Sequence, residues 1–449
     1  MTTAGEGRSG RRALLAGAVA GLTGAAVLGS GATGAAAATQ SLDWYSVKDY
    51  GAYGDGSHDD TAAVQSAINA AQAAGGTVYF PAGSYLVVPG SSGAALTVTG
   101  NGVRLAGAGS KASTLVKGGN GILLRLSGQA DPSGAKHLRY CSVENLGFNG
   151  AGRTGLLLEL YYNDNSYFRD LYLTSNNDLA IDAVEFWDSR FYNLVIESCT
   201  GTPDSTSQPN IWLRNTSSAT PGTWGYSQDN VNQIHFTGCR LENFGTGALW
   251  ITQGTAGTNN PNGIYLTDCK FETSNMQGGP HLKADASCRA VYATDIYCFA
   301  GGFAQGYAKA QNIIVWSPSF SALENVLIAN GNAATVNAGV DLYSGPGSTA
   351  VLRNVVGQYG AAPTGTHVYY ESSSTGDFRV DGCYGTKGAQ ATGTLPTANQ
   401  GNPPLRLVAG PVSDASFTHP PLDGTMAVDT AGNRLYVRVG GVWRWSQLN

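Results

Sequence analysis

Short runs in which apolar and polar residues alternate recur along this chain, and several of them end on a cysteine. The clearest are NLVIESC, QIHFTGC, GIYLTDC and DFRVDGC, which end at Cys199, Cys239, Cys269 and Cys383. A period of two is typical of β-strands with one buried face. The irregular spacing of the runs, with turns rich in Asn, Ser and Thr between them, favours a solenoid of stacked coils.

Equivalent residues of successive coils should stack inside such a solenoid, with neighbouring coils about 4.8 Å apart. We expect the inward residues to include Val184, Phe186, Leu194, Ile196, Phe236 and Leu266. Cysteines at the same place in successive coils would then form a ladder of small buried side chains. Redox or metal chemistry is the weaker alternative, because the seven cysteines include no C-x-x-C pair and no Cys/His cluster.

The pattern of residues 47–87 predicts the first helix and strands of the fold. Residues 62–74 are strong helix formers, followed by a Gly-Gly stop and by two strand-like runs, TVYF and SYLV. One face of this helix is apolar and consists of Val64, Ala67, Ile68 and Ala71. An amphipathic helix at this place would cap the open end of the first coil.

An acidic group precedes the helix and could suggest a catalytic or metal site. It consists of Asp55, Asp59 and Asp60. Asp60 and the adjacent Thr61 are good helix N-caps, and negative charge there favours the helix dipole. We therefore interpret these aspartates as turn and cap residues rather than as catalytic groups.

The same segment resembles the opening signature of the pectate-lyase-like superfamily. That signature is V-x-D-[FY]-G-A-x-G-D-G-x-x-D-D-T-x-A-[IV]-Q, followed by G-G-T-V-Y-F-P-x-G-x-Y, and residues 47–65 and 75–85 match it. The resemblance implies an all-β fold, a right-handed parallel β-helix with an N-terminal capping helix. The signature also opens polygalacturonase-like hydrolases, glucanases, alginate epimerases and phage tailspike depolymerases, so it indicates a fold more surely than a reaction.

The chain departs from the catalytic motifs of those subfamilies. It has no Asp-Pro-His-Glu run like that of the alginate epimerases and no Asp-Asp and Gly-His pairing like that of the polygalacturonases. It also has no clear Arg-x-Pro-x-x-Arg stretch like that of the calcium pectate lyases. No catalytic residue can therefore be transferred from these relatives.

Composition and the two termini define the expected organisation. Charged residues make up 13% of the chain and the net charge is -5, which argues against a nucleic-acid partner. Arg11-Arg12, a short apolar run and an Ala-x-Ala site resemble a twin-arginine export signal, so we expect a secreted protein with no membrane contact after cleavage. A membrane anchor is the alternative, but the apolar run is short and broken by glycines.

Three segments follow from these patterns. We predict a signal peptide over residues 1–38, the β-helix over 39–390, and a linker with a small C-terminal β hairpin module over 391–449. In the last segment, TAGN is a turn between strand-like runs. The module resembles short C-terminal pieces of phage fibres and secreted β-helix proteins. It could cap the helix or mediate assembly, for which a homotrimer is the candidate.

Aligning the coils by their inward residues brings chemistry-bearing side chains onto one outer face. We treat Leu158/Leu160, Val184/Phe186, Ile211/Leu213 and Leu249/Ile251 as equivalent pairs. The outward column between them then contains Glu159, Glu185, Trp212 and Trp250, and the next column contains Tyr161, Trp187 and Arg214. A slip of one residue would turn the glutamates inward.

Carboxylates beside aromatic rings suit a carbohydrate site. In this alignment, Glu159 and Glu185 are one coil apart, about 5 Å, as in a retaining glycosidase pair. For hydrolysis we expect Glu185 as acid/base with Glu159 as its partner, and Asp188 as a further catalytic candidate. The alternatives are solvated ladder residues for the glutamates, burial for the tryptophans and a turn role for Asp188.

Elimination would instead need a base near the C5 proton of a uronate and a cation for its carboxylate. Arg214, Arg240 and Lys270 are the candidate cations. Glu242 and Glu272 repeat thirty residues apart beside Arg240 and Lys270, and form either a surface ion-pair ladder or an acidic patch. No cofactor is certain. Calcium is compatible with such a patch, although no all-oxygen loop motif is present.

These features predict an extracellular polysaccharide-degrading enzyme, a glycoside hydrolase or a polysaccharide lyase on a uronate-containing polymer. A non-catalytic glycan-binding or adhesive β-helix spike is the alternative from another functional class. In that alternative, the aromatic column would be the binding surface.

Overall fold

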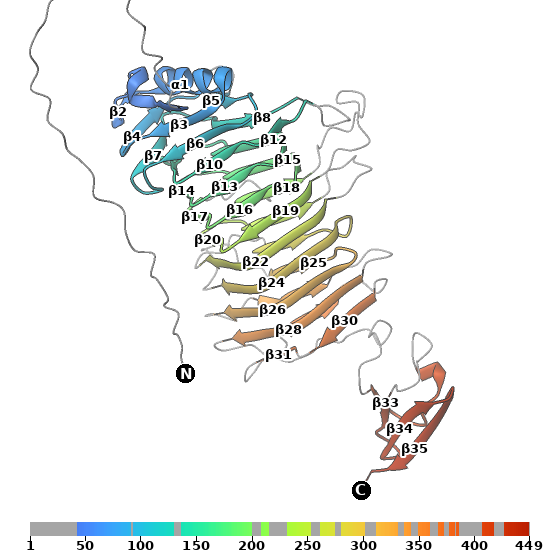
Figure 1. Cartoon of the computed structure of the whole chain (residues 1–449). Coiled ribbons are helices and arrows are strands. Elements are labelled where there is room, and N and C mark those ends of the chain that lie inside the picture. The colour runs from blue at the N-terminus through green and yellow to red at the C-terminus, as the bar shows by residue number, and fades with distance from the viewer. Residues whose placement is uncertain are drawn as a thin grey trace, which may run out of the picture. The chain divides into compact units, whose positions relative to one another are not determined.

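A computed structural model describes residues 43–90, 93–129, 136–199, 208–214, 231–252, 261–273, 280–300, 311–330, 336–342, 349–359, 367–371, 377–381, 383–385, 406–416 and 426–448. The chain coils into a stack of parallel strands, and each strand pairs with its equivalent in the next coil (Figure 1). The predicted fold class, an all-β parallel β-helix, is confirmed. The predicted signal peptide and most of the linker lie outside the described residues.

Each coil contributes strands to three faces, which we call face 1, face 2 and face 3. Face 1 consists of β5 (Ala94–Val98), β8 (Ile122–Ser127), β12 (Leu158–Asp164), β15 (Ile181–Trp187), β18 (Ile211–Arg214), β21 (Leu249–Thr252), β23 (Leu282–Ala284), β25 (Gln311–Trp316), β27 (Val336–Leu342) and β29 (His367–Glu371). The short strand β9 (Leu138–Arg139) pairs with the end of β12.

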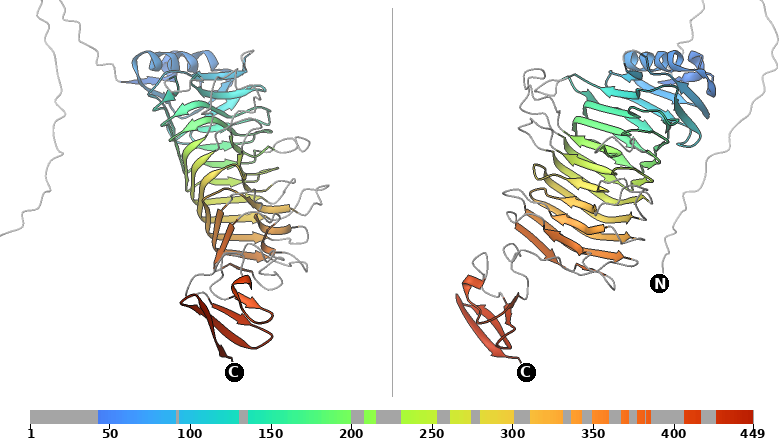
Figure 2. Two further views of the ribbon diagram at one scale, coloured as in Figure 1. Left: turned by 90° about the vertical axis from the view of Figure 1, so that its right-hand side faces the viewer. Right: turned by 180° about the vertical axis from the view of Figure 1, so that it is seen from behind.

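Face 2 begins at the N-terminal end of the stack. It consists of β1 (Trp44–Ser46), β3 (Gly76–Phe80), β6 (Val103–Gly107), β10 (Ser142–Glu144), β13 (Tyr167–Arg169), β16 (Arg190–Tyr192), β19 (Asn232–Thr237), and the longer strands β22 (Asn262–Thr273), β24 (Arg289–Ala300), β26 (Ser321–Asn330), β28 (Thr349–Tyr359) and β30 (Asp377–Asp381). Figure 2 shows this stack from two further sides.

Face 3 follows face 2 in each coil. It consists of β2 (Asp55–Asp59), β4 (Gly83–Val87), β7 (Ser113–Lys117), β11 (Gly147–Asn149), β14 (Tyr172–Thr174), β17 (Val195–Glu197), β20 (Arg240–Glu242), the second halves of β22, β24, β26 and β28, and β31 (Tyr384–Gly385). Between faces 2 and 3 the chain turns through left-handed residues, of which Asn193 has φ 49°.

The interior of the coils is a continuous hydrophobic core. Phe191 is fully buried between two phenylalanines of the adjacent coils, with ring centroids 4.8 Å from Phe168 and 4.7 Å from Phe236. Of the residues expected to point inward, Phe186, Leu194, Ile196, Phe236 and Leu266 belong to this core. Stacking of equivalent side chains is therefore what joins one coil to the next.

The cysteines are free thiols, and only two of the predicted ladder members occupy the same place in adjacent coils. Register equates Thr237 with Thr267, so Cys239 and Cys269 follow at the same place in adjacent coils. Cys199 does not share it, because its strand β17 pairs with β20 on face 3. The shared pattern of alternation before a cysteine does not distinguish a strand of face 2 from one of face 3, so the predicted ladder was too long.

The helix predicted over residues 62–74 is α1 (Thr61–Ala74), preceded by the 3₁₀ helix η1 (Val47–Tyr50). Its four predicted apolar residues are fully buried, and α1 lies over the strands that begin the stack (Figure 1). Asp60 is at the N-cap position, but its carboxylate accepts the backbone N–H groups of Tyr53 at 2.6 Å and Gly54 at 3.0 Å. It therefore supports the Gly-Asp-Gly turn rather than the helix end.

The C-terminal residues form a separate small sheet. Its strands are β32 (Arg406–Val408), β33 (Met426–Asp429), β34 (Arg434–Val439) and β35 (Val442–Gln447), with the 3₁₀ helix η3 (Asp414–Ser416) beside them. The predicted TAGN turn joins β33 to β34. Within the described residues, no helix combines the length and apolarity that crossing a bilayer requires.

Candidate active site on face 1

The outward side of face 1 carries a column of charged and aromatic residues, one from each of six successive strands. Register places these residues directly over one another in the order Arg125, Glu159, Asp182, Trp212, Trp250 and Lys283. We call this set the face 1 column. The second column, two residues further along each strand, contains Ser127, Tyr161, Val184, Arg214 and Thr252. Both columns lie outside the hydrophobic core.

The predicted pairing of Glu159 with Glu185 was wrong. Glu159 pairs with Asp182 in the next coil, not with Glu185, because Leu158 aligns with Ile181 rather than with Val184. The error has a local cause. Glu185 has a left-handed backbone with φ 48°, and the residues on either side of it do not share a side: Val184 joins the outward second column, whereas Phe186 lies in the core. Asp182 therefore takes the place in the column that was assigned to Glu185.

Both carboxylates of the face 1 column form ion pairs with arginines. The guanidinium of Arg125 donates to the carboxylate of Glu159. Arg214 donates in the same two-pronged way to Asp182, with distances of 3.0 Å from Nε and 2.8 Å from Nη2. Glu159 and Asp182 are only 6% and 3% exposed, so the arginines form the more accessible part of this cluster.

Tyr161 completes the cluster from the second column. Its hydroxyl donates to the carboxylate of Asp182, and Nη2 of Arg214 lies 3.5 Å from the same hydroxyl. Burial, together with the negative charge of Asp182, raises the pKa of Tyr161. Burial opposes the charge of Arg214, but hydrogen bonds to Asp182 outweigh it and raise the pKa of this guanidinium. The phenol therefore keeps its proton and the arginine keeps its charge.

Two tryptophans continue the face 1 column, as predicted. Trp212 is partly exposed, donates to Thr252 Oγ1 at 2.7 Å, and lies against the guanidinium of Arg214. Trp250 is 6% exposed and donates to the carbonyl of Pro280 at 2.9 Å. Lys283 Nζ lies 5.4 Å from the ring centroid of Trp250. Of these two tryptophans, Trp212 therefore offers the accessible aromatic surface beside the charged cluster.

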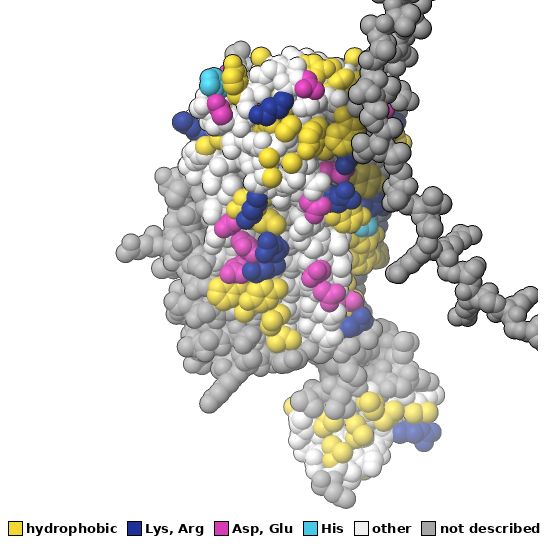
Figure 3. Space-filling model, turned by 60° about the vertical axis from the view of Figure 1, so that its left-hand side comes forward, with side chains coloured by type: hydrophobic (Ala, Val, Ile, Leu, Met, Phe, Trp, Pro, Cys, Tyr) yellow, Lys and Arg dark blue, Asp and Glu magenta, His cyan; other side chains and the backbone are white. Residues whose placement is uncertain are grey.

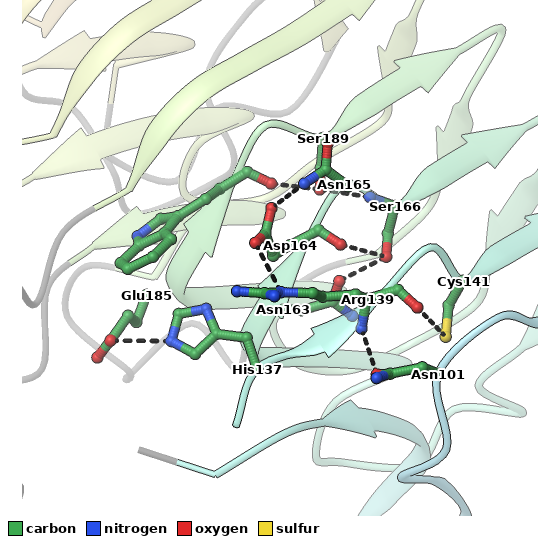
Figure 4. A network of polar contacts seen from close by, with 11 residues as sticks. Asn101, His137, Arg139, Cys141, Asn163, Asp164, Asn165, Ser166, Glu185 and Ser189 are labelled. Carbon is green, nitrogen blue, oxygen red and sulfur yellow. Dashed lines mark hydrogen bonds and ion pairs between the residues drawn. The ribbon is translucent and has the colours of Figure 1, made fainter. Parts of the chain in front are cut away.

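Glu185 lies at a neighbouring corner, in the polar network of Figure 4. Its Oε1 is 3.0 Å from His137 Nε2, and both side chains are almost completely buried. The Trp187 ring packs on His137 with centroids 4.3 Å apart. The predicted role of Glu185 as an accessible acid/base is not supported by this position, because the pair is closed to solvent. Trp187 is partly exposed at the same corner.

Asp188 is exposed and left-handed, with φ 47°, where β15 turns into β16. Partial burial of its carboxyl group and the negative charge of Asp164 raise its pKa. Asp164 itself forms an ion pair with Arg139 at 3.1 Å (Figure 4). Asp188 therefore occupies a turn and also faces a second carboxylate close to the face 1 cluster.

The remaining predicted residues lie on face 3. Arg240 aligns with Lys270, and Glu242 with Glu272. Lys270 Nζ is 2.9 Å from Glu242 and also contacts Glu272, while Arg240 is 3.8 Å from Glu242. Figure 3 shows adjoining basic and acidic side chains of this kind on the surface. The ion-pair ladder is confirmed, and these residues do not join Glu159 and Asp182.

In the part of the chain that the structure describes, no acidic cluster is suited to calcium. There, no three His, Cys, Asp or Glu side chains are grouped so as to hold a metal ion. Glu242 and Glu272, the residues considered for calcium, instead share Lys270 between them.

Three residues were not anticipated, namely Arg125 and Asp182 in the cluster and His137 at the neighbouring corner. For Asp182 the signal was present, because Ile181-Asp182-Ala183 alternates in the same way as Leu158-Glu159-Leu160. Arg125 lies in β8, where ILLRLS shows the same alternation one coil earlier. No local pattern indicates His137, which precedes a strand of two residues.

Comparison with known proteins agrees with this fold. Residues 44–133 match the family model for rhamnogalacturonase A/epimerase, pectate lyase-like. Mannuronan C5-epimerase AlgE3 of Azotobacter vinelandii is 42% identical over 109 residues, which are 24% of this chain and 6% of the epimerase. Plasmin and fibronectin-binding protein A of Streptococcus pneumoniae is 66% identical over 44 residues, which are 9% of this chain and 6% of that protein.

Among solved structures, the ORF18 protein of Geobacillus virus E2 superimposes with a TM-score of 0.57 at 17% identity, covering 90% of this chain and 86% of that one. This likeness concerns the fold alone, and the curated relatives match over only a small part of their own length. The signature, the family match over residues 44–133 and the parallel coils all agree with the pectate-lyase-like superfamily of parallel β-helix proteins.

Proposed function

We propose that this protein is an exported carbohydrate-active enzyme whose substrate is a uronate-containing polysaccharide. The observation that supports this most is the face 1 cluster, in which Arg125 and Arg214 lie beside Tyr161 and the partly exposed ring of Trp212. Arginine recognises carboxylates through paired hydrogen bonds. Aromatic rings pack on the apolar faces of sugars. A relative named as a mannuronan C5-epimerase also supports a uronate polymer as the substrate.

Elimination fits this cluster better than hydrolysis. A retaining hydrolase needs one carboxyl group that donates a proton and a second that attacks. Here each carboxylate of the column accepts hydrogen bonds from an arginine, which suits a charged base such as Glu159 but not a protonated carboxyl group acting as general acid. The hydroxyl of Tyr161 is the proton donor of this cluster. Elimination uses such a donor together with a cation for the uronate carboxylate.

The proposed reaction is a β-elimination across C4 and C5 of a uronate residue. Arg214 neutralises the uronate carboxylate, and Glu159 takes the proton from C5. The electron pair left on C5 forms the C4–C5 double bond as the C4–O bond breaks. Tyr161 donates its proton to the departing oxygen, so the products are an unsaturated uronate and a new chain end. An epimerase acting at C5 would begin with removal of the same proton.

The test is to incubate the purified protein with alginate, pectate and a neutral glucan. We expect ultraviolet absorbance of the unsaturated uronate with one of the acidic polymers, and none with the glucan. Tyr161→Phe should lower the rate about 10²- to 10⁴-fold, as for loss of a general acid, while Arg240→Gln on face 3 leaves it unchanged. Reducing ends without this absorbance would indicate hydrolysis, and inversion at C5 without cleavage would indicate epimerisation.

A non-catalytic glycan-binding or adhesive spike is the second candidate. The low exposure of Glu159 and Asp182 favours it, because carboxylates that act on a substrate must touch it. The match to a plasmin and fibronectin-binding protein also favours it. Binding to a polymer with no product on any of the three substrates would support this candidate over the enzyme.

A further inference from the structure

A second outward column on face 2 consists of rings and one guanidinium, and the proposed reaction does not use it. Register places the residues over one another in five successive coils, in the order Tyr167, Arg190, His235, Tyr265 and Tyr292. We call this set the ring ladder. Figure 3 shows hydrophobic, basic and histidine side chains along the right-hand edge of the β-helix.

The rings of the ladder stack on one another. His235 and Tyr265 have centroids 4.6 Å apart and an interplanar angle of 13°, and Tyr265 and Tyr292 are 5.5 Å apart at 16°. Arg190 Nη1 donates to the Tyr167 hydroxyl at 3.2 Å. Because the faces of the stacked rings cover each other, their edges and polar tips point to solvent. Tyr167 and Tyr292 remain 43% and 38% exposed.

A row of hydroxyls runs beside the ladder. Thr237, Thr267 and Thr294 are aligned in successive coils, two residues along the strands from His235, Tyr265 and Tyr292. The coils repeat at about 4.8 Å. Hydrogen-bonding tips set out at one fixed interval suit a polymer with its own fixed repeat better than they suit a single small molecule.

The charge of this surface selects the kind of polymer. Arg190 has no carboxylate within ion-pair distance among the residues that the structure describes, unlike Arg240 and Lys270 on face 3. Aromatic edges carry partial positive charge. The ring ladder therefore offers one accessible cation, positive ring edges and hydroxyl groups, and so it favours an anionic, hydroxyl-rich chain.

We propose that the ring ladder is a second, non-catalytic binding face for an extended uronate-containing polysaccharide lying along the helix axis. This inference rests on the proposed function for the class of polymer, but not for the reaction. A ladder that only stabilises the coils by stacking is the competing explanation. The two explanations differ in one expectation. Only a binding face needs the exposed hydroxyl and guanidinium groups for polysaccharide binding when the protein is folded.

The experiment measures binding of the full chain to oligogalacturonate and oligomannuronate by calorimetry. Tyr161→Phe serves as background, so that no substrate is consumed. Arg190→Gln and Tyr292→Ser change exposed tips, and Arg240→Gln is the control on face 3. We expect each ladder variant to weaken binding about tenfold, the pair about a hundredfold, and added salt to weaken the parent more than Arg190→Gln. Thermal unfolding confirms that each variant is folded.

Two outcomes would overturn the inference. One is unchanged affinity in the folded double variant, and the other is an equal loss in Arg240→Gln. Failure of the proposed reaction has a different signature, in which no polymer is cleaved while binding still depends on the ladder. Conversely, cleavage of short oligomers with ladder-independent binding would retain the enzyme and remove the second face.

Discussion

Lys117 is a single residue on which the packing of face 3 depends. Its side chain is 1% exposed, and Nζ donates to the Gly155 carbonyl and to Asn176 Oδ1, both at 2.8 Å. Burial lowers its pKa from 10.5 to about 8. At pH values where this amine is protonated, burying its charge makes folding less favourable.

The pH dependence follows from this shift. Between pH 8 and 10.5 the unfolded chain keeps the proton on Lys117 and the folded chain does not. The unfolded state then binds more protons, so stability rises with pH in this window. We expect the free energy of unfolding of the wild type, relative to Lys117→Met, to increase by up to about 3 kcal/mol. Urea unfolding of both proteins at pH 7.5 and pH 10 measures this.

Taking the difference between the two proteins removes the other titrations. Cys141 and Cys199 have pKa values raised by burial to about 11 and about 12, so they act in the opposite direction above pH 9 in both proteins. A constant difference across the pH range would show that Lys117 stays charged in the folded protein.

Single residues also set the limit of what the sequence could predict at face 1. Alternation correctly placed Glu159, Tyr161, Trp212 and Arg214 on the outward side. It failed in β15, because the left-handed residue Glu185 separates an outward Val184 from an inward Phe186. A Glu at a positive φ has no distinctive sequence signal, since Gly and Asn are the residues usually expected there.

At the scale of the element, the turns between faces 2 and 3 repeat one backbone conformation. Asn145, Asp170, Asn193, Asn325 and Asn354 all have φ between 49° and 54°. Their side chains also join successive coils: Asn193 Nδ2 donates to Asp170 Oδ1 at 2.7 Å. The turn type therefore demands residues that tolerate the left-handed region.

A substitution at Asn193 tests this demand. Asn193→Gly should stay close to wild-type stability, because glycine adopts the left-handed conformation without steric cost. Asn193→Val should lower the free energy of unfolding by about 1–2 kcal/mol. Thr174→Val, on strand β14, is the matched control and should have little effect, since β-branched residues suit strands. Equal losses for Asn193→Val and Asn193→Gly would instead point to the lost hydrogen bond.

Elements were easier to predict than their places in the coil. The helix over 62–74, the strands TVYF and SYLV, and the strand-like run after the TAGN turn were expected within a few residues of where they occur. Assigning strands to faces was harder, as Cys199 and Cys239 show. Both cysteines follow an alternating run, but Cys199 follows a strand of face 3 and Cys239 follows a strand of face 2. That distinction depends on how many residues each turn contains.

For the whole molecule, each coil contacts mainly its two neighbours, so stability should depend on protecting the ends of the stack. At the N-terminal end, α1 gives that protection. Its buried residue Ile68 has no exposed surface, and the helix contacts β1, β3, β5 and β6. Unprotected strands at an open end would offer hydrogen-bonding groups to other molecules.

Ile68→Asp tests this cap. An aspartate there would be buried without a partner, so α1 should detach and expose the first coil. We expect hydrogen exchange to become faster in β1, β3 and β5 while β22 and β24 remain protected, because coupling decays from coil to coil. Size-exclusion chromatography should show association of the variant. Ala62→Asp places the same charge on the exposed side of α1 and should leave both properties unchanged. Loss of protection extending equally to β24 would show that the whole stack unfolds as one unit.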